Sequence, residues 1–283
     1  ALPIFYKALV SKIMLGTITF TLQANNKASL PEFPGRYLHA AIFSLIGSID
    51  GTSSSYWHNI FGIKPFTVQL HFKSNRKNRG IRYIQENDIL YLQINVWHRN
   101  LWGILARVSA PSTIQIGELK ASIIDIQHEA PFGLPLHQDN ILDLVNWRLE
   151  SKLVKTIEFK FKVPTLFNGT HGELTFPTAE LIFASIVDKW NAGDVEDVLD
   201  KPRIKELSKH IILTDWKGHT KRVYFGRDRG YTGFVGGFTF NLSKLEAEEN
   251  HLITILALFG QHCGIGRLSS QGLGQVDILL KDK

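Results

Sequence analysis

The hydrophobic pattern of residues 13–127 changes between two periods in a fixed order, and this order restricts the fold more than any other feature. Alternating apolar residues predict strands at 13–23, 66–72, 89–96 and 113–127. The helical spacing i, i+3, i+4 and i+7 is followed after the first strand by Leu38, Ala41, Ile42 and Leu45. A second, short helix is predicted at 100–108. The order is therefore β-α-β-β-α-β, that of a ferredoxin-like domain.

The same order is predicted again in the second half of the chain. A strand at 156–163 precedes a helix at 177–190, and residues 210–242 are expected to form at least two strands with a turn near Lys217-Gly218. A capping box, Ser243-x-x-Glu246, is expected to open the next helix, and Gly260 is expected to end it. The last strand is predicted at 274–280.

The segment between the halves is rich in helix-breaking residues, which are Pro131, Gly133 and Pro135. We place the domain junction at 131–152, between an N-terminal domain at 1–130 and a C-terminal domain at 153–283. The predicted fold class is therefore α+β, with two tandem ferredoxin-like (RRM-like) domains side by side and a glycine-rich loop before the last strand.

Positive charge is concentrated in two segments of a chain whose net charge is +6. No acidic residue occurs from Gly51 through Gln85, where the basic residues are Lys64, Lys73, Arg76, Lys77, Arg79 and Arg82. The second cluster is interleaved with aromatic residues and contains Lys209, Lys217, Lys221, Arg222, Arg227 and Arg229. A solvated surface and a phosphate-binding surface use the same residues, so either cluster alone fits both. Two clusters with interleaved aromatics favour RNA.

Other classes of protein and site find little support. The single cysteine, Cys263, excludes an internal disulfide framework, and no Cys or His pair has the spacing of a structural zinc site. The acidic residues of 194–200 follow a predicted helix and are interpreted as a solvated loop rather than a metal centre. The apolar run 252–260 is too short to cross a bilayer, so we expect a cytoplasmic protein without membrane contact.

The segment 260–274 (GQHCGIGRLSSQGLG) places five glycines between a helix and the last strand. Such a loop can turn successive backbone N–H groups towards a phosphate, because glycine adopts positive φ and lets the backbone approach closely. A Rossmann loop is excluded, since that motif needs a strand followed by a helix. The alternative is a tight connection between helix and sheet without a binding role.

Residues 226–278 resemble the C-terminal signature of the CRISPR-associated repeat-RNA processing endoribonucleases of the RAMP superfamily. The similar features are an aromatic and glycine-rich strand at 233–240, a helix, the loop GIGRLSSQGLG at 264–274 and a short strand. Residues 34–46 (PGRYLHAAIFSLI) and 157–167 (IEFKFKVPTLF) look like that family's first helix and the opening strand of its second domain.

The resemblance implies that CRISPR repeat RNA (pre-crRNA) lies across the cleft between the domains, with the glycine-rich loop beside the scissile phosphate. It implies a metal-independent endoribonuclease that uses no cofactor. In such enzymes the 2′-hydroxyl attacks the adjacent phosphate, which leaves a 2′,3′-cyclic phosphate and a 5′-hydroxyl. RNA contacts are expected from Lys217, Lys221, Arg222, Arg227, Arg229, Gly264, Gly266, Arg267, Ser269, Ser270, Gln271, Gly272 and Gly274.

This chemistry requires a group that carries a proton near neutral pH, and the resemblance points to His39 on the first helix among the 11 histidines. Arg36 or Lys27 is expected to stabilise the phosphate in the transition state, and Tyr37 to orient or deprotonate the nucleophile. Tyr37 lies about 160° from His39 on a regular helix. The lysine that this family often carries one or two turns after its histidine is absent here. His262 in the glycine-rich segment is the closest rival.

Two other functions stay open at this point. A non-catalytic RNA-binding RAMP subunit of a CRISPR effector complex would keep the loop and the charge but need no proton transfer. A small-molecule enzyme of the same fold would leave the basic clusters unexplained. Contacts with other CRISPR effector proteins and a homodimer are compatible with the resemblance.

Overall fold

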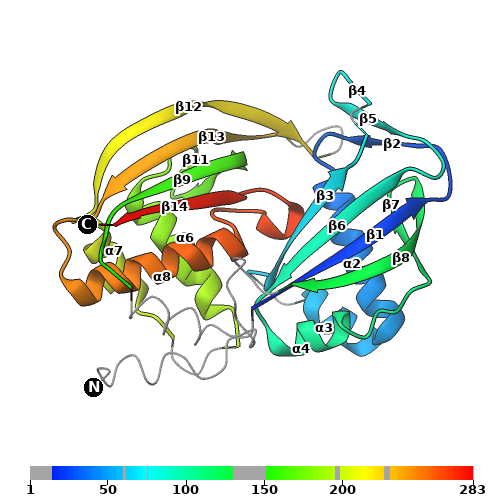
Figure 1. The fold of residues 1–283 in the computed structure, drawn as a ribbon, viewed down its shortest axis with the longest axis horizontal. Coiled ribbons are helices and arrows are strands. Elements are labelled where there is room, and N and C mark those ends of the chain that lie inside the picture. The colour runs from blue at the N-terminus through cyan, green and yellow to red at the C-terminus, as the bar shows by residue number, and fades with distance from the viewer. Residues whose placement is uncertain are drawn as a thin grey trace.

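The computed structural model describes residues 15–59, 62–74, 76–129, 151–194, 198–225 and 230–282. Two antiparallel sheets lie side by side, each covered on one face by helices (Figure 1). The predicted junction at 131–152 falls almost entirely outside the described residues, so the domain boundaries stay a prediction.

The N-terminal sheet has the strand order β3-β6-β1-β8-β7, and every neighbouring pair is antiparallel. Its ferredoxin-like elements are β1 (Gly16–Ala24), α2 (Gly35–Ile49), β3 (Phe66–Phe72), β6 (Ile89–Val96), α4 (Arg99–Leu105) and β8 (Leu119–Glu129). The additions are β2 (Ala28–Pro31), α3 (Gly51–Asn59), β4 (Lys77–Asn78), β5 (Ile81–Ile84) and β7 (Ser112–Ile116). The β-α-β-β-α-β order predicted for this half is therefore confirmed.

One predicted strand, 113–127, is in fact a hairpin of β7 and β8. Gly117 turns the chain with φ of +60°. The phase of the alternation changes there: Ile114 and Ile116 are buried before the turn, whereas the odd-numbered Leu119 and Ala121 are buried after it. The alternation of buried residues therefore changes phase at Gly117, and the two strands are not one continuous strand.

The C-terminal sheet has the order β12-β13-β9-β14, again antiparallel throughout. In chain order its elements are β9 (Val154–Thr165), the hairpin β10 (Phe167–Gly169) and β11 (Gly172–Leu174), α6 (Ala179–Asn191), α7 (Lys201–Ser208), β12 (Ile212–Tyr224), β13 (Gly230–Asn241), α8 (Ala247–Cys263), the 3-10 turn η2 (Ser269–Gln271) and β14 (Val276–Asp282). The helix α7 was not predicted. With the extra elements set aside, the strand order repeats that of the first sheet, as the ferredoxin-like prediction requires.

The turn expected near Lys217-Gly218 is wrong, because β12 continues through these residues. Gly218 pairs with Gly236 in the middle of the hairpin. A Cβ on Gly218 would lie 2.3 Å from the Phe234 ring and 2.4 Å from the Val235 carbonyl oxygen. The glycine therefore serves close packing between strands rather than a turn.

Both predicted ends of α8 are also wrong. The capping box is formed by Glu246 and Glu249, three residues later than expected. Ser243 belongs to the preceding turn, where its N–H donates to the Asn241 side chain at 2.8 Å. The helix continues through Gly260, because the missing side chain there leaves room for Ile186 of α6, which lies 2.8 Å from the Cβ position.

The two domains meet where the end of α8 packs against β6. The Asn95 amide donates to the His262 carbonyl oxygen at 2.9 Å, and the Trp97 indole donates to the Lys189 carbonyl oxygen at 2.9 Å. Trp97 is fully buried in the hydrophobic core of the C-terminal domain. A second contact joins α2 to η2, since a Cβ on Gly35 would lie 1.9 Å from the Gln271 carbonyl oxygen. These contacts fix α2 against the glycine-rich loop.

Gly35→Ala should therefore force α2 and η2 apart. Overpacking of this kind costs about 1–3 kcal/mol. We expect a lower free energy of unfolding in urea. The matched control is Gly103→Ala in α4, where a Cβ meets nothing within 4 Å. It should be neutral or slightly stabilising, because alanine favours helix. Equal stability of the two variants would contradict the close contact.

Candidate active site and RNA interface

His39 lies half-buried on α2, among aromatic rings and positive charge. Its ring centroid is 4.8 Å from that of Phe43 and 6.0 Å from that of Phe66. Burial, followed by the charges of Lys64 and His58, lowers the pKa of His39 to about 4. The imidazole is therefore neutral at pH 7 and able to accept a proton.

Lys64 and His58 are the groups that the sequence analysis did not include in the site. His58 ends α3, and its ring lies 5.4 Å from that of Phe43. Lys64 donates through Nζ to the His58 carbonyl oxygen at 3.0 Å, and burial lowers the pKa of Lys64. The only signal for them in the sequence was the run without acidic residues, to which both belong.

The structure places the other residues predicted around His39, which are Arg36, Tyr37 and Lys27, in different surroundings. Arg36 is exposed in the first turn of α2, one turn before His39. Tyr37 is directed to the β7–β8 turn, where its ring would be 3.3 Å from a Cβ on Gly117. Lys27 is exposed after β1. Tyr37 is therefore not part of the proton-transfer site that we propose.

His262, the rival, does not lie in the glycine-rich loop but in the last turn of α8, and it is 4% exposed. Its Nε2 lies 3.1 Å from the Val96 carbonyl oxygen. Burial lowers the pKa of His262 to about 4, although the hydrogen bond to Val96 opposes this change. The side chain is a structural contact between the domains and is closed off from a phosphate in this structure.

The N–H groups in the first part of the glycine-rich loop are bonded within the protein rather than offered to a ligand. The N–H of Ile265 donates to Gly274, that of Gly266 to the Ser185 hydroxyl and that of Arg267 to Leu166, at 2.7–2.8 Å. The positive φ values are 70°, 81°, 82° and 73° at Gly264, Gly266, Gly272 and Gly274. A Cβ would lie 2.4 Å from the Leu166 carbonyl oxygen at Gly266 and 1.9 Å from that of Ile265 at Gly274. These glycines allow the loop to fold on itself.

The polar side chains of the loop differ in what they can offer to RNA. Ser269 is buried, whereas Ser270 and Gln271 are partly exposed on η2. Arg267 pairs with Glu173 of β11 at 2.9 Å, and both side chains are about one-third exposed, at 34% and 32%. Ser270 and Gln271 therefore remain the most accessible donors of the loop.

The basic residues of β12 lie on both faces of this edge strand. Lys217 is exposed, and the Arg222 guanidinium lies 5.5 Å from the centroid of the Tyr224 ring. Lys221 points towards the N-terminal domain, where its Nζ lies 4.8 Å from the centre of the Phe33 ring. Arg227 and Arg229, also predicted to bind RNA, lie outside the described residues.

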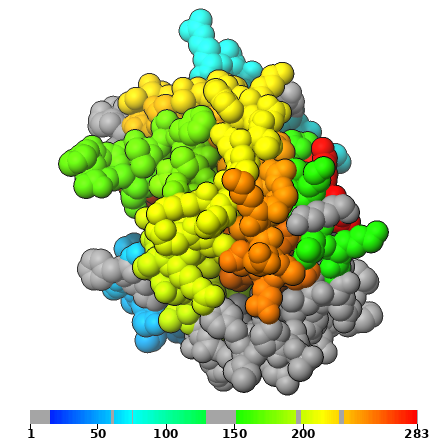
Figure 2. Space-filling model, turned by 90° about the vertical axis from the view of Figure 1, so that its left-hand side faces the viewer, coloured from blue at the N-terminus to red at the C-terminus, as the bar shows by residue number. Residues whose placement is uncertain are grey.

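A groove of about 260 Å³ opens between the two domains, next to the first turn of α2. The polar side chains along it are Glu32, Gln69, His71, Arg82, Lys162, Lys221, Gln271 and Gln275. A larger hollow of about 420 Å³ lies between α7 and the start of α8, which are yellow-green and orange in Figure 2. Its lining includes Glu206, Glu248 and Glu249, which repel phosphate. The groove is thus the better match to a polyanion.

Among the described residues, no group of three or more His, Cys, Asp or Glu side chains is arranged to hold a metal ion. The helices of this part of the chain also include none that is long and apolar enough to span a membrane.

The two ferredoxin-like sheets and the glycine-rich loop before the last strand form the fold that the resemblance predicts. Residues 159–276 match the family model described as CRISPR-associated endoribonuclease Cas6. A Streptococcus thermophilus CRISPR-associated endoribonuclease Cas6 is 25% identical over 179 residues, which are 62% of this chain and 67% of that protein. The C-terminal part of the chain is therefore similar to the Cas6 endoribonucleases.

Solved structures agree with the fold. A Cas6 product complex superposes with a TM-score of 0.72 at 20% identity, covering 94% of this chain and 100% of that chain. A Cas6 variant in which one histidine is replaced by alanine gives a TM-score of 0.67 at 16% identity, covering 96% and 100%.

The buried His262 makes stability depend on pH. Its folded pKa of about 4 lies below the ordinary value of 6.5, so between these values the unfolded chain binds more protons than the native protein. The free energy of unfolding should fall by roughly 2–3 kcal/mol as the pH is lowered through this range. Urea unfolding from pH 7 to pH 4 measures this.

The matched variant is His262→Gln, which keeps a donor for the Val96 carbonyl but does not titrate. It should be less stable than wild type at pH 7 and should show a shallower loss of stability towards acid. His39 contributes equally to both proteins, so the difference in slope reports His262. An unchanged slope would show that His262 is protonated in the native state.

Proposed function

We propose that this protein is an endoribonuclease that cleaves CRISPR repeat RNA without a metal ion, through attack of the 2′-hydroxyl on the adjacent phosphate. The products are a 2′,3′-cyclic phosphate and a 5′-hydroxyl. The observation that carries the proposal is a neutral, half-buried His39 with Lys64 beside it, on the helix that contacts the glycine-rich loop through Gly35. The similarity of residues 159–276 to the Cas6 family model supports repeat RNA as the substrate.

His39 acts as the general base in this proposal. Because its pKa is about 4, the imidazole enters the reaction without a proton and takes the proton of the 2′-hydroxyl. A bound RNA phosphate brings negative charge to the site, which raises the pKa of His39 towards the working pH. The protonated imidazole is then able to return a proton to the departing 5′-oxygen.

Lys64 and Arg36 supply the positive charge that the phosphate needs as charge accumulates in the transition state. The charge of Lys64 lowers the pKa of His39, and Arg36 lies one turn before His39 on α2. Fixed cations stabilise a developing charge without solvent reorganisation. They take the part that a metal ion has in other nucleases.

RNA binding is assigned to the basic strand β12, the groove and the exposed donors of the glycine-rich loop. Lys217, Lys221 and Arg222 present positive charge from β12, and Ser270 and Gln271 present neutral hydrogen-bond donors from η2. Phosphate contacts of this kind give an affinity that falls steeply with salt. The predicted contacts of Arg227 and Arg229, and those with other CRISPR effector proteins or a second copy of the chain, stay predictions.

The non-catalytic RNA-binding subunit is the second candidate, and no observation favours it. It would need neither a neutral histidine nor a lysine beside it. The two candidates differ in one expectation: the loss of His39 slows RNA cleavage in an endoribonuclease, whereas a non-catalytic subunit cleaves no RNA with or without His39.

His39→Ala should lower the single-turnover rate of repeat RNA cleavage by about 10²- to 10⁴-fold. The dissociation constant should hardly change, because a proton-transfer group acts in the transition state. The assay contains EDTA throughout, and the product ends are identified by their sensitivity to a cyclic phosphodiesterase. His210→Ala, a change at an exposed histidine after α7, is the matched control and should cut at the wild-type rate.

Three results would contradict this proposal. A wild-type rate in His39→Ala would remove the assigned base. Activity that appears with magnesium and disappears with EDTA would exclude the metal-independent mechanism. A wild-type protein that binds repeat RNA tightly but cuts it under neither condition would favour the non-catalytic subunit.

Lys64→Met should raise the pKa of His39, because it removes a positive charge that disfavours the imidazolium. The new pKa should stay below 6.5, since burial is the larger cause of the shift. NMR titration of ¹³C-labelled histidines measures it, and cleavage should slow in the same variant. Lys73→Met, which removes a charge that does not act on His39, is the control. An unchanged pKa in Lys64→Met would separate Lys64 from the site.

A further inference from the structure

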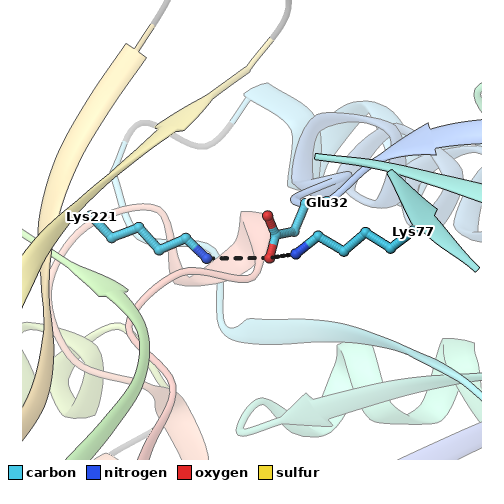
Figure 3. A network of polar contacts seen from close by, with 3 residues as sticks. All are labelled: Glu32, Lys77 and Lys221. Carbon is cyan, nitrogen blue, oxygen red and sulfur yellow. Dashed lines mark hydrogen bonds and ion pairs between the residues drawn. The ribbon is translucent and has the colours of Figure 1, made fainter. Parts of the chain in front are cut away.

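A single carboxylate in the interdomain groove is held by lysines from both domains. Lys77 of β4 lies with its Nζ 2.6 Å from Oε1 of Glu32, and Lys221 of β12 lies with its Nζ 3.2 Å from the same oxygen (Figure 3). The chain distance between Glu32 and Lys221 is 189 residues, so the contact joins the two domains. Both ammonium groups converge on one anionic oxygen, which is the geometry of an anion-binding site.

The surroundings of this carboxylate are positive. Among the described residues that line the groove, Glu32 is the only acidic one, whereas Arg82, Lys162 and Lys221 are basic. The Arg82 guanidinium lies 4.5 Å from the centre of the Phe72 ring, and its Nε is buried without a hydrogen-bond partner in the described part of the protein. A buried donor of this kind is normally satisfied, and a phosphate oxygen would satisfy it.

The ion pairs of Glu32 with Lys77 and Lys221 are weak enough for another anion to replace the carboxylate. Its side chain is 24% exposed and those of Lys77 and Lys221 are 35% and 39% exposed. Partly exposed ion pairs contribute about 0–1 kcal/mol each. Burial opposes ionisation of Glu32, but the hydrogen bonds from Lys77 and Lys221 outweigh it and lower the pKa below its usual value, so Glu32 is an anion at pH 7.

We propose that the groove is a phosphate-binding subsite for the RNA backbone, and that Glu32 occupies the phosphate position between Lys77 and Lys221. RNA must displace this carboxylate to reach the two ammonium groups, so Glu32 lowers the affinity for RNA. The inference rests on the proposed function, since it assigns the ligand as RNA. Gly35 lines the groove and His39 follows one turn later on α2, so the subsite holds a phosphate a few nucleotides from the bond that is cut.

The test uses Glu32→Gln, which keeps the shape of the side chain and removes its charge. The probe is fluorescein-labelled RNA of one CRISPR repeat, 2′-O-methylated at every nucleotide so that it is not cleaved. Its dissociation constant is measured by anisotropy at several salt concentrations. We expect Glu32→Gln to bind about fivefold more tightly at low salt, and the gain to shrink as salt rises.

The matched control is Glu206→Gln, which makes the same change in net charge at an exposed ion pair with Lys209 on the far side of the C-terminal domain. It should bind as wild type does. In a Lys77→Met/Lys221→Met background, which should itself weaken binding about tenfold, Glu32→Gln should give no further gain.

Weaker or unchanged binding by Glu32→Gln, with wild-type protein binding the probe, would overturn this inference and leave the proposed function standing. An equal gain in Glu206→Gln would overturn it as well, because net charge alone would then explain the effect. If wild-type protein does not bind the RNA at all, the proposed function fails together with the subsite. Thermal unfolding of each variant checks that the fold is retained.

Discussion

The structure depends on the buried contact between the C-terminal end of α8 and the C-terminal end of β6. Asn95 donates to the His262 carbonyl oxygen, and the His262 imidazole lies 3.1 Å from the Val96 carbonyl oxygen. Because these groups are buried, a shift of one domain that broke the hydrogen bonds without admitting water would leave them unsatisfied, at a cost of about 1–3 kcal/mol for each group. The contact therefore holds the two sheets in one arrangement. The position of the glycine-rich loop, which begins directly after His262, follows from it.

The glycine-rich loop in turn contacts α2, the helix that carries the candidate base His39. Gly35 allows the helix to touch the Gln271 carbonyl, and His39 follows one turn later. The loop glycines also allow close packing, because they let the chain fold on itself with the N–H groups of Ile265, Gly266 and Arg267 bonded internally. In the proposed site, phosphate recognition is assigned to side chains, which are Lys221 and Arg82 in the groove and Lys64, whose charge acts on His39. The proposed site thus combines an internally hydrogen-bonded loop with a groove whose ion pairs are partly exposed.

Electrostatics separates the two parts of the site. Around His39 the nearby charges are positive, and together with burial they keep the imidazole without a proton. In the groove, one carboxylate is placed among lysines and an arginine. In the proposed mechanism, the positive surroundings keep His39 neutral and able to accept a proton. In the proposed subsite, Glu32 pairs with Lys77 and Lys221 until an RNA phosphate displaces it. Both are consequences of charges that lie far apart in the chain.

Element order, the two ferredoxin-like sheets and the helix that carries His39 were determined by the sequence itself, since hydrophobic periodicity is a local property and burial demands it. Local patterns failed where a glycine serves packing rather than a turn, as at Gly218 and Gly260, because the clashing atom belongs to another element. Only the tertiary structure shows that His262 is a buried contact to Val96 of the other domain, whereas His39 is half-buried. It alone brought Lys64 to His39 and Glu32 to Lys221, because an interaction between side chains distant in sequence leaves no periodic signal in the chain.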